Sequence, residues 1–166
     1  MTRKRPIPIA LLLALLTAIL GLQAAVVSAK AAKILEWDTM VGVPAAFTGA
    51  TNPIRGINGG GVPWILTSGS GELTSSGHLE ITVDGLVLAT TGSNPLATFR
   101  ATVSCLGADA SIQNVQTGTF PATTGPAASG GGDASIEADL VLPQPCIAPI
   151  VFVTSAGGSW FASTGG

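Results

Sequence analysis

The most constraining feature of this sequence is an alternation of apolar and polar residues in short segments that glycine or proline soon interrupts. Residues 79–83, 99–105 and 136–142 show it most clearly, with apolar side chains at every second position. A period of two places these side chains on one face of a β-strand, and a mainly polar opposite face is typical of antiparallel sheets. No stretch after the N-terminal region repeats apolar positions at helical spacing. The sequence therefore predicts an all-β fold.

Roughly nine strands are expected, a number that favours two packed sheets. We therefore predict an antiparallel β-sandwich, immunoglobulin-like or jelly-roll-like. An immunoglobulin domain places a tryptophan between its two cysteines, but here all three tryptophans lie outside the interval from Cys105 to Cys146. Besides the three alternating segments, strands are predicted at residues 34–41, 63–68, 86–90, 112–120, 150–154 and 159–162.

Two connections between these strands carry signals of their own. The Asp84-Gly85 pair predicts either a hairpin turn or a bulge inside one long strand over residues 78–90. Residues 122–132 (ATTGPAASGGG) are low in complexity and predict a mobile surface connection.

The N-terminus has the three parts of a secretory signal peptide. Basic residues at positions 3–5 precede an apolar run over residues 7–22, and small residues at 27–29 suit a signal peptidase. Cleavage after residue 29 would remove residues 1–29 and leave residues 30–166 as a single β-sandwich domain. This processing predicts a secreted, extracellular protein.

The alternative is a membrane anchor that is not cleaved. Residues 9–29 form a run of 21 positions without a charge, which is long enough for a membrane-spanning helix. In that case residues 7–29 would hold the protein in the envelope. The small residues at the end of the run and the polar Gln23 favour cleavage instead.

Removal of residues 1–29 leaves an acidic chain, with four basic residues against nine acidic ones and a formal net charge of −5. A surface almost free of lysine has little affinity for nucleic acid or anionic lipid. We therefore expect no nucleic-acid partner and no membrane contact after signal cleavage. The expected partner is an extracellular or cell-envelope ligand.

Cys105 and Cys146 are the only cysteines. In an oxidising compartment they are expected to form a structural disulfide. The bond would close a loop of about 42 residues, which is worth roughly 4 kcal/mol when loop entropy alone is counted. A redox-active pair would need closer spacing or a neighbour that stabilises a thiolate, and neither is visible.

No catalytic constellation is visible, so we expect a protein that is not an enzyme. His78 is the only histidine, no G-x-S-x-G occurs, and no lysine follows Lys33. No metal-binding spacing or cofactor motif is present either, so neither a metal nor a cofactor is predicted. A facing carboxylate pair for glycoside hydrolysis is the remaining route to catalysis. The acids available to it are Glu72, Glu80, Asp84, Glu137 and Asp139.

Residues 49–64 (GATNPIRGINGGGVPW) form the most unusual stretch. Its five glycines permit backbone N–H groups to line a small concavity, and Arg55 could clamp an anion there. The alternative is an ordered loop in which Arg55 pairs with a nearby acid such as Glu36 or Asp38. The residues predicted to form a ligand-binding loop are Asn52, Arg55, Asn58 and Trp64.

Three stretches carry a resemblance that covers most of the chain from about Trp37 to Ala162: TMVGVPAAFTGATNPIRGINGGGVPW, NPLATFRATVSCL and PCIAPIVFVTSAGGSWFA. Together they resemble a group of small, uncharacterised secreted bacterial proteins. The resemblance implies export and a Cys105–Cys146 bond, and it carries no known activity or site residues.

These observations favour an exported β-sandwich that works outside the cell or at its surface as a binding or structural module. Two alternatives remain. One is a secreted carboxylate-dependent hydrolase that acts on polysaccharide. The other is an envelope protein anchored by its uncleaved N-terminal helix.

Overall fold

The structure is a computed structural model, and it describes residues 31–164 of the 166-residue chain. The predicted signal peptide, residues 1–29, lies outside the described residues. Within residues 31–164 there is no α-helix, only strands and two short 3-10 turns, η1 (Ala45–Phe47) and η2 (Ala127–Ser129). None of the described helices is long and apolar enough to cross a membrane. The predicted all-β class is confirmed.

Sheet A contains four antiparallel strands in the order β1-β4-β5-β11. Its inner face is apolar because Leu73, Leu79 and Ile81 are buried while their neighbours along the strands point outward. The strands are β1 (Lys33–Trp37), β4 (Ser68–Thr74), β5 (His78–Asp84) and β11 (Ala134–Asp139).

Sheet B contains five antiparallel strands in the order β2-β13-β12-β8-β9. Phe99, Ala101 and Val103 of β8 lie fully buried on its inner face. The strands are β2 (Met40–Gly42), β8 (Thr98–Leu106), β9 (Ile112–Pro121), β12 (Ile147–Thr154) and β13 (Trp160–Thr164).

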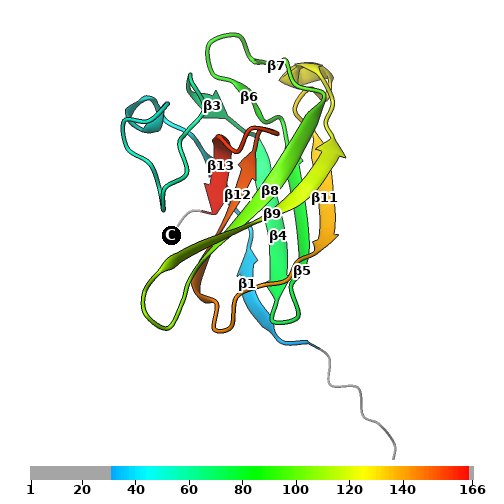
Figure 1. Cartoon of the computed structure of the whole chain (residues 1–166). Coiled ribbons are helices and arrows are strands. Elements are labelled where there is room, and N and C mark those ends of the chain that lie inside the picture. Colours follow the sequence, from blue (N-terminus) through cyan, green and yellow to red (C-terminus); the bar gives the residue numbers. More distant parts are fainter. Residues whose placement is uncertain (1–30, 165–166) are drawn as a thin grey trace, which may run out of the picture. The chain divides into compact units, whose positions relative to one another are not determined.

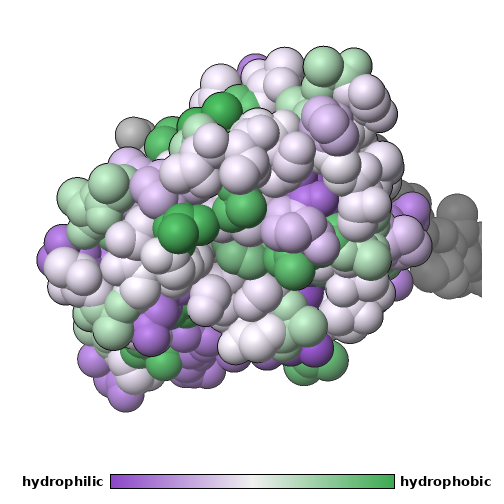
Figure 2. Space-filling view, turned by 90° about the horizontal axis from the view of Figure 1, so that it is seen from above, coloured by the Kyte–Doolittle hydropathy of each residue, from purple (hydrophilic) through white to green (hydrophobic). Residues whose placement is uncertain are grey.

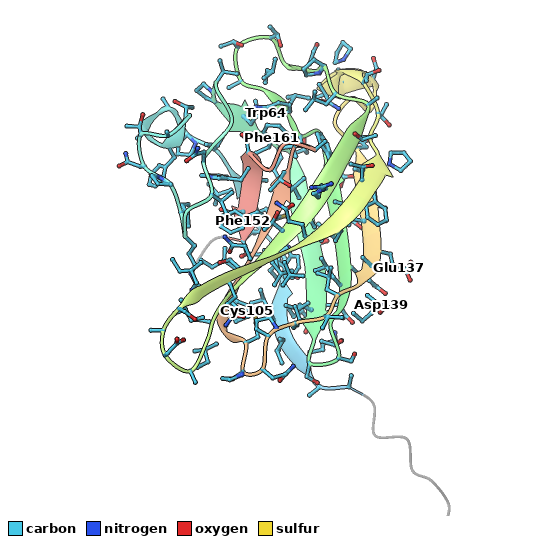
Figure 3. The ribbon with its side chains drawn as sticks, viewed as in Figure 1. Trp64, Cys105, Glu137, Asp139, Phe152 and Phe161 are labelled. Atoms are coloured by element: carbon cyan, nitrogen blue, oxygen red, sulfur yellow. A yellow bond between two sulfur atoms is a disulfide. The ribbon has the colours of Figure 1, made fainter. Side chains whose placement is uncertain are left out.

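The two sheets enclose one hydrophobic core, an arrangement consistent with a β-sandwich (Figure 1). Trp64 stacks on Phe161 with ring centroids 4.1 Å apart, and Phe99 meets both rings edge-on near one end of the core. Near the other end, Cys105 and Cys146 form a disulfide with Cα atoms 4.9 Å apart. The predicted bond is therefore present, and it joins β8 to the segment just before β12 (Figure 3).

Two small ribbons complete the described part. The two-residue strands β3 (Trp64–Ile65) and β6 (Val87–Leu88) pair with each other, as do β7 (Ser93–Asn94) and β10 (Gly125–Pro126). Seen from above (Figure 2), hydrophobic residues lie here in small groups among paler and hydrophilic ones. The low-complexity stretch 122–132 is hydrogen-bonded to its surroundings at this end of the fold. The Gly132 amide donates to the Thr123 carbonyl, and the Leu86 amide donates to the Gly132 carbonyl.

Three strand predictions need correction. The single strand expected over residues 34–41 is divided between β1 of sheet A and β2 of sheet B, because the chain crosses between the layers at Asp38 and Thr39. Strand β4 covers residues 68–74, of which only Ser68 lies within a predicted strand. Asp84-Gly85 is neither a hairpin nor a bulge, since β5 ends there and β6 pairs in a different sheet.

Candidate functional site

Four glutamates form a continuous row across the outer face of sheet A. Glu36 lies opposite Glu72, Glu72 opposite Glu80, and Glu80 opposite Glu137, so each strand of the sheet contributes one. Each glutamate projects outward because its chain neighbours fill the core side; in β5, for example, Leu79 and Ile81 are buried while Glu80 is exposed. We call these four residues the glutamate row.

The glutamate row borders an open hollow of about 400 Å³ on this face. The next row of the sheet, Ser70, Thr82 and Ser135, lines the hollow with hydroxyl groups, and Asp38 adds a fifth carboxylate. In Figure 3, Glu137 and Asp139 project outward from β11, away from sheet B. The face is therefore strongly anionic, polar and open to solvent.

Lys33 neutralises one end of the row. Its ammonium lies 2.8 Å from Glu36 Oε1 and 2.6 Å from Glu72 Oε2. The hydrogen bond to Glu36, followed by that to Glu72, raises the pKa of Lys33 above its ordinary range. This end of the row thus already holds a cationic amine.

His78 lies near the other end. Its Nε2 is 3.0 Å from Glu80 Oε1 and its Nδ1 is 2.9 Å from Asp139 Oδ1. The hydrogen bonds to Glu80 and then Asp139 raise the pKa of His78 above its ordinary value, because both carboxylates stabilise the imidazolium form. The side chain of Glu137 makes no hydrogen bond or ion pair with any residue in 31–164.

His78, Glu80 and Glu137 are the described residues that could hold a metal ion. One ligand atom of each lies within 4.8 Å of the other two. One imidazole and two carboxylates suit a borderline cation such as Zn²⁺, and Asp139 at Nδ1 would orient the ring with Nε2 toward the ion. A proton on Nε2 competes with such an ion, so any affinity would increase with pH.

The same two glutamates have a spacing relevant to hydrolysis. Carboxylate oxygens of Glu80 and Glu137 approach within 4.8 Å, close to the roughly 5 Å separation of retaining glycosidases. Such enzymes keep one carboxyl protonated by placing it in an apolar environment. Both glutamates are exposed instead, so neither has the apolar surroundings that would keep a general acid protonated.

The predicted loop residues are not gathered into one site. Trp64 lies in the core, and the Asn52 amide donates to the Ala46 carbonyl within its own loop. Arg55 donates to the carbonyl oxygens of Ser104 at 3.3 Å and Ala148 at 2.8 Å, rather than to Glu36 or Asp38. Its guanidinium therefore fastens the loop to sheet B.

Of those four residues, Trp64 also borders a mainly apolar hollow of about 340 Å³ beside β2 and β3. Asn58 borders a polar one, of about 290 Å³, on the outer face of sheet B. The chain over residues 43–63, which we call the covering loop, lies against that face. Phe47 of this loop contacts Trp160 edge-on with ring centroids 6.4 Å apart, and the Trp160 amide donates to the Asn58 carbonyl.

The sequence alone indicates the outward position of two of the four glutamates, Glu80 and Glu137. In β5 and β11 each glutamate stands between two apolar residues, Leu79 and Ile81 or Ile136 and Ala138, which places it on an outer face. The register that aligns the row depends on which strands pair, and the most distant partners, Glu36 and Glu137, are about 100 residues apart in the chain.

No protein-family model matches the chain, nor does any curated protein or solved structure.

Proposed function

We propose that this protein is an exported, non-catalytic β-sandwich of the immunoglobulin-like or jelly-roll-like kind, and that it binds a positively charged ligand outside the cell or at its surface. The ligand lies along the glutamate row. Export is supported by the signal-peptide pattern of residues 1–29, and the disulfide is compatible with an oxidising extracellular environment. A retained helix at residues 7–29 is the alternative, and it would place the same binding face in the envelope.

The observation that carries this proposal is the alignment of four glutamates in register. Like charges directly opposite each other destabilise a sheet. An outer face does not need charge to remain soluble, as the neighbouring row of Ser70, Thr82 and Ser135 illustrates. Lys33 offsets the repulsion between Glu36 and Glu72, and His78 contacts Glu80. The Glu137 carboxylate is left without a counter-charge among the described residues, and this is better explained by binding than by folding.

The contacts of Lys33 support a cationic amine as the chemical class of the ligand. Two glutamates of the row already hold its ammonium through short contacts. The other half of the row also places two carboxylates side by side, with oxygens of Glu80 and Glu137 within 4.8 Å. Glu80 contacts His78, and the Glu137 side chain has no partner among the described residues. With neighbouring strands about 4.8 Å apart, the row is about 14 Å long, which suits successive charges on an extended basic peptide segment.

The test is binding of a short lysine- and arginine-rich peptide to the full mature chain, measured by calorimetry at low and physiological salt. We expect weak binding that salt reduces, and a loss of affinity of about 1.4- to fivefold in Glu137→Gln, since exposed ion pairs contribute about 0.2–1 kcal/mol. The matched control is Asp109→Asn, which removes the same charge from the turn between β8 and β9. Absence of binding at low salt, or equal losses in both variants, would contradict the proposal.

A polysaccharide hydrolase is the second candidate, favoured by the separation of Glu80 and Glu137. It predicts release of reducing ends from polysaccharide, with a bell-shaped pH profile that Glu137→Gln abolishes. We expect no release, because both carboxyls face solvent. Turnover lost in Glu137→Gln and kept in Asp109→Asn would favour the hydrolase over the binding module.

A further inference from the structure

The outer face of sheet B carries an unusual group of buried polar atoms. Among the described residues, five buried side-chain nitrogen or oxygen atoms lack a hydrogen-bond partner. Four of them belong to residues on this face: Arg100 Nε, Thr102 Oγ1, Ser104 Oγ and Trp160 Nε1. A buried polar group without a partner costs about 1–3 kcal/mol, so native proteins contain few of them. Their concentration on one face calls for a specific explanation.

The hollow on that face gives one. Thr102 lies directly opposite Gln116 in the pairing of β8 with β9, so the two side chains share a face, and both line the 290 Å³ hollow. Thr102 itself is 0% exposed to solvent. The hollow therefore has a hydroxyl-bearing residue at its base whose hydrogen-bonding capacity the protein does not use.

The remaining lining of the hollow is uncharged and rich in hydrogen-bonding groups. Amide side chains come from Asn58, Asn114 and Gln116, a hydroxyl comes from Ser159, and glycines leave backbone groups uncovered. No carboxylate, ammonium or guanidinium lines it. Side-chain amides both donate and accept, as the hydroxyl groups of a sugar do, so such a lining matches a neutral polyol better than an ion or an apolar molecule.

The walls of the hollow are held in place by contacts within the protein. The Asn114 amide donates to the Arg55 carbonyl at 3.1 Å, while the Arg55 guanidinium reaches Ser104 and Ala148. On the opposite side, Arg100 donates to Gln116 Oε1 at 2.9 Å. A site built on fixed strands and a fastened loop needs little ordering when a ligand binds.

We propose that this hollow is a second binding site, specific for a neutral saccharide, with Thr102, Asn114 and Gln116 as its polar contacts. Its volume is near the lower end for ligand pockets, about 300 Å³, which suits one sugar unit rather than a longer chain. The site lies on the opposite sheet from the glutamate row and does not depend on the binding of a cationic ligand there.

The experiment is titration of the isotope-labelled mature chain with glucose, galactose, mannose and N-acetylglucosamine, followed by NMR amide shifts. We expect at least one sugar to shift the amides of residues 56–58 and 157–159, while Glu137→Gln leaves this binding unchanged. Thr102→Val keeps the shape of the side chain and removes only the hydroxyl. It should weaken binding about tenfold, the effect of losing one good hydrogen bond.

Ser104→Ala is the matched control, because Ser104 is buried and unpartnered on the same strand and face but does not line the hollow. It should leave sugar affinity unchanged. Thr102→Val should also unfold at the same denaturant concentration as wild type or a higher one, since its hydroxyl has no partner to lose. Equal affinities in wild type and Thr102→Val, shifts confined to other residues, or no shifts with any of the four sugars would each overturn the proposal.

Discussion

At the scale of single residues, the charged side chains are divided between the two faces. The basic residues after Lys33 are Arg55 and Arg100, and both contact the outer face of sheet B. The glutamates gather on sheet A, where Lys33 and His78 are the cations that face them. Arg55 serves the fold here, because its guanidinium fastens the covering loop to carbonyl oxygens of β8 and β12.

His78 makes the stability of this face depend on pH. Glu80 and Asp139 raise the pKa of His78 in the folded state, so the protonated ring stabilises the fold fully below its ordinary pKa of 6.5. That contribution disappears as the pH rises through the raised pKa. We therefore expect His78→Gln to be less stable than wild type at pH 5.5 and to approach wild type above pH 8.

Urea unfolding of both proteins at several pH values measures this difference. The comparison is made between variants, because any pH dependence that does not involve His78 is common to the two chains. A difference that stays constant from pH 5.5 to pH 8.5, or that grows with pH, would contradict the assigned contacts.

At the scale of elements, β4 shows why a strand can resemble a turn in sequence. Its residues SGSGELT include two glycines, which ordinarily weaken a strand. A Cβ at Gly69 would lie 2.9 Å from Met40 Cβ, and one at Gly71 would lie 2.5 Å from Trp37 Cζ2. Side chains from β1 and β2 therefore fill the space over β4, and glycine is what permits that packing.

The prediction for this element is that Gly71→Ala destabilises the protein by about 3 kcal/mol, a large value for overpacking. The added methyl would overlap Trp37 and come closer still to the backbone oxygen of Glu80. Chemical denaturation measures the change in the free energy of unfolding.

Gly118→Ala in β9 is the matched control, since no atom lies within 4 Å of the position of its Cβ. It should change stability by less than about 0.5 kcal/mol. Similar losses at Gly71 and Gly118 would mean that β4 is not packed beneath Trp37.

At the scale of the whole molecule, the disulfide joins β8 to the chain entering β12 across 41 positions of sequence. The position of Cys105 on the apolar side of an alternating strand was visible in the sequence, and in the fold this residue is fully buried. One experiment on the native protein can therefore test both its export and its disulfide.

Intact-mass analysis of culture medium and membranes makes that test. We expect a soluble species that begins near Lys30 and gains two hydrogens on reduction. Reduction should lower the free energy of unfolding by roughly 4 kcal/mol if loop entropy dominates. Full-length protein found only in membranes would show that residues 7–29 serve as an anchor, and an unchanged mass on reduction would exclude the bond in the native protein.

The sequence by itself determined the all-β class, the outward position of Glu80 and Glu137, and the presence of two cysteines that can form a disulfide. Each of these follows from local chemistry, because strand periodicity assigns a residue to one face whatever its partners are. The polar positions of β8 mark the limit of that reasoning: Thr102 and Ser104 alternate as solvent-facing residues should, yet both are fully buried.

Only the tertiary structure decided the register of the glutamate row, the place of β4 and the hollow over Thr102. These features depend on pairing between segments far apart in the chain, and on a covering loop whose own sequence gives no indication of the surface it meets. Periodicity indicates which face of a strand a side chain occupies. Long-range packing decides whether solvent or another part of the chain lies against that face.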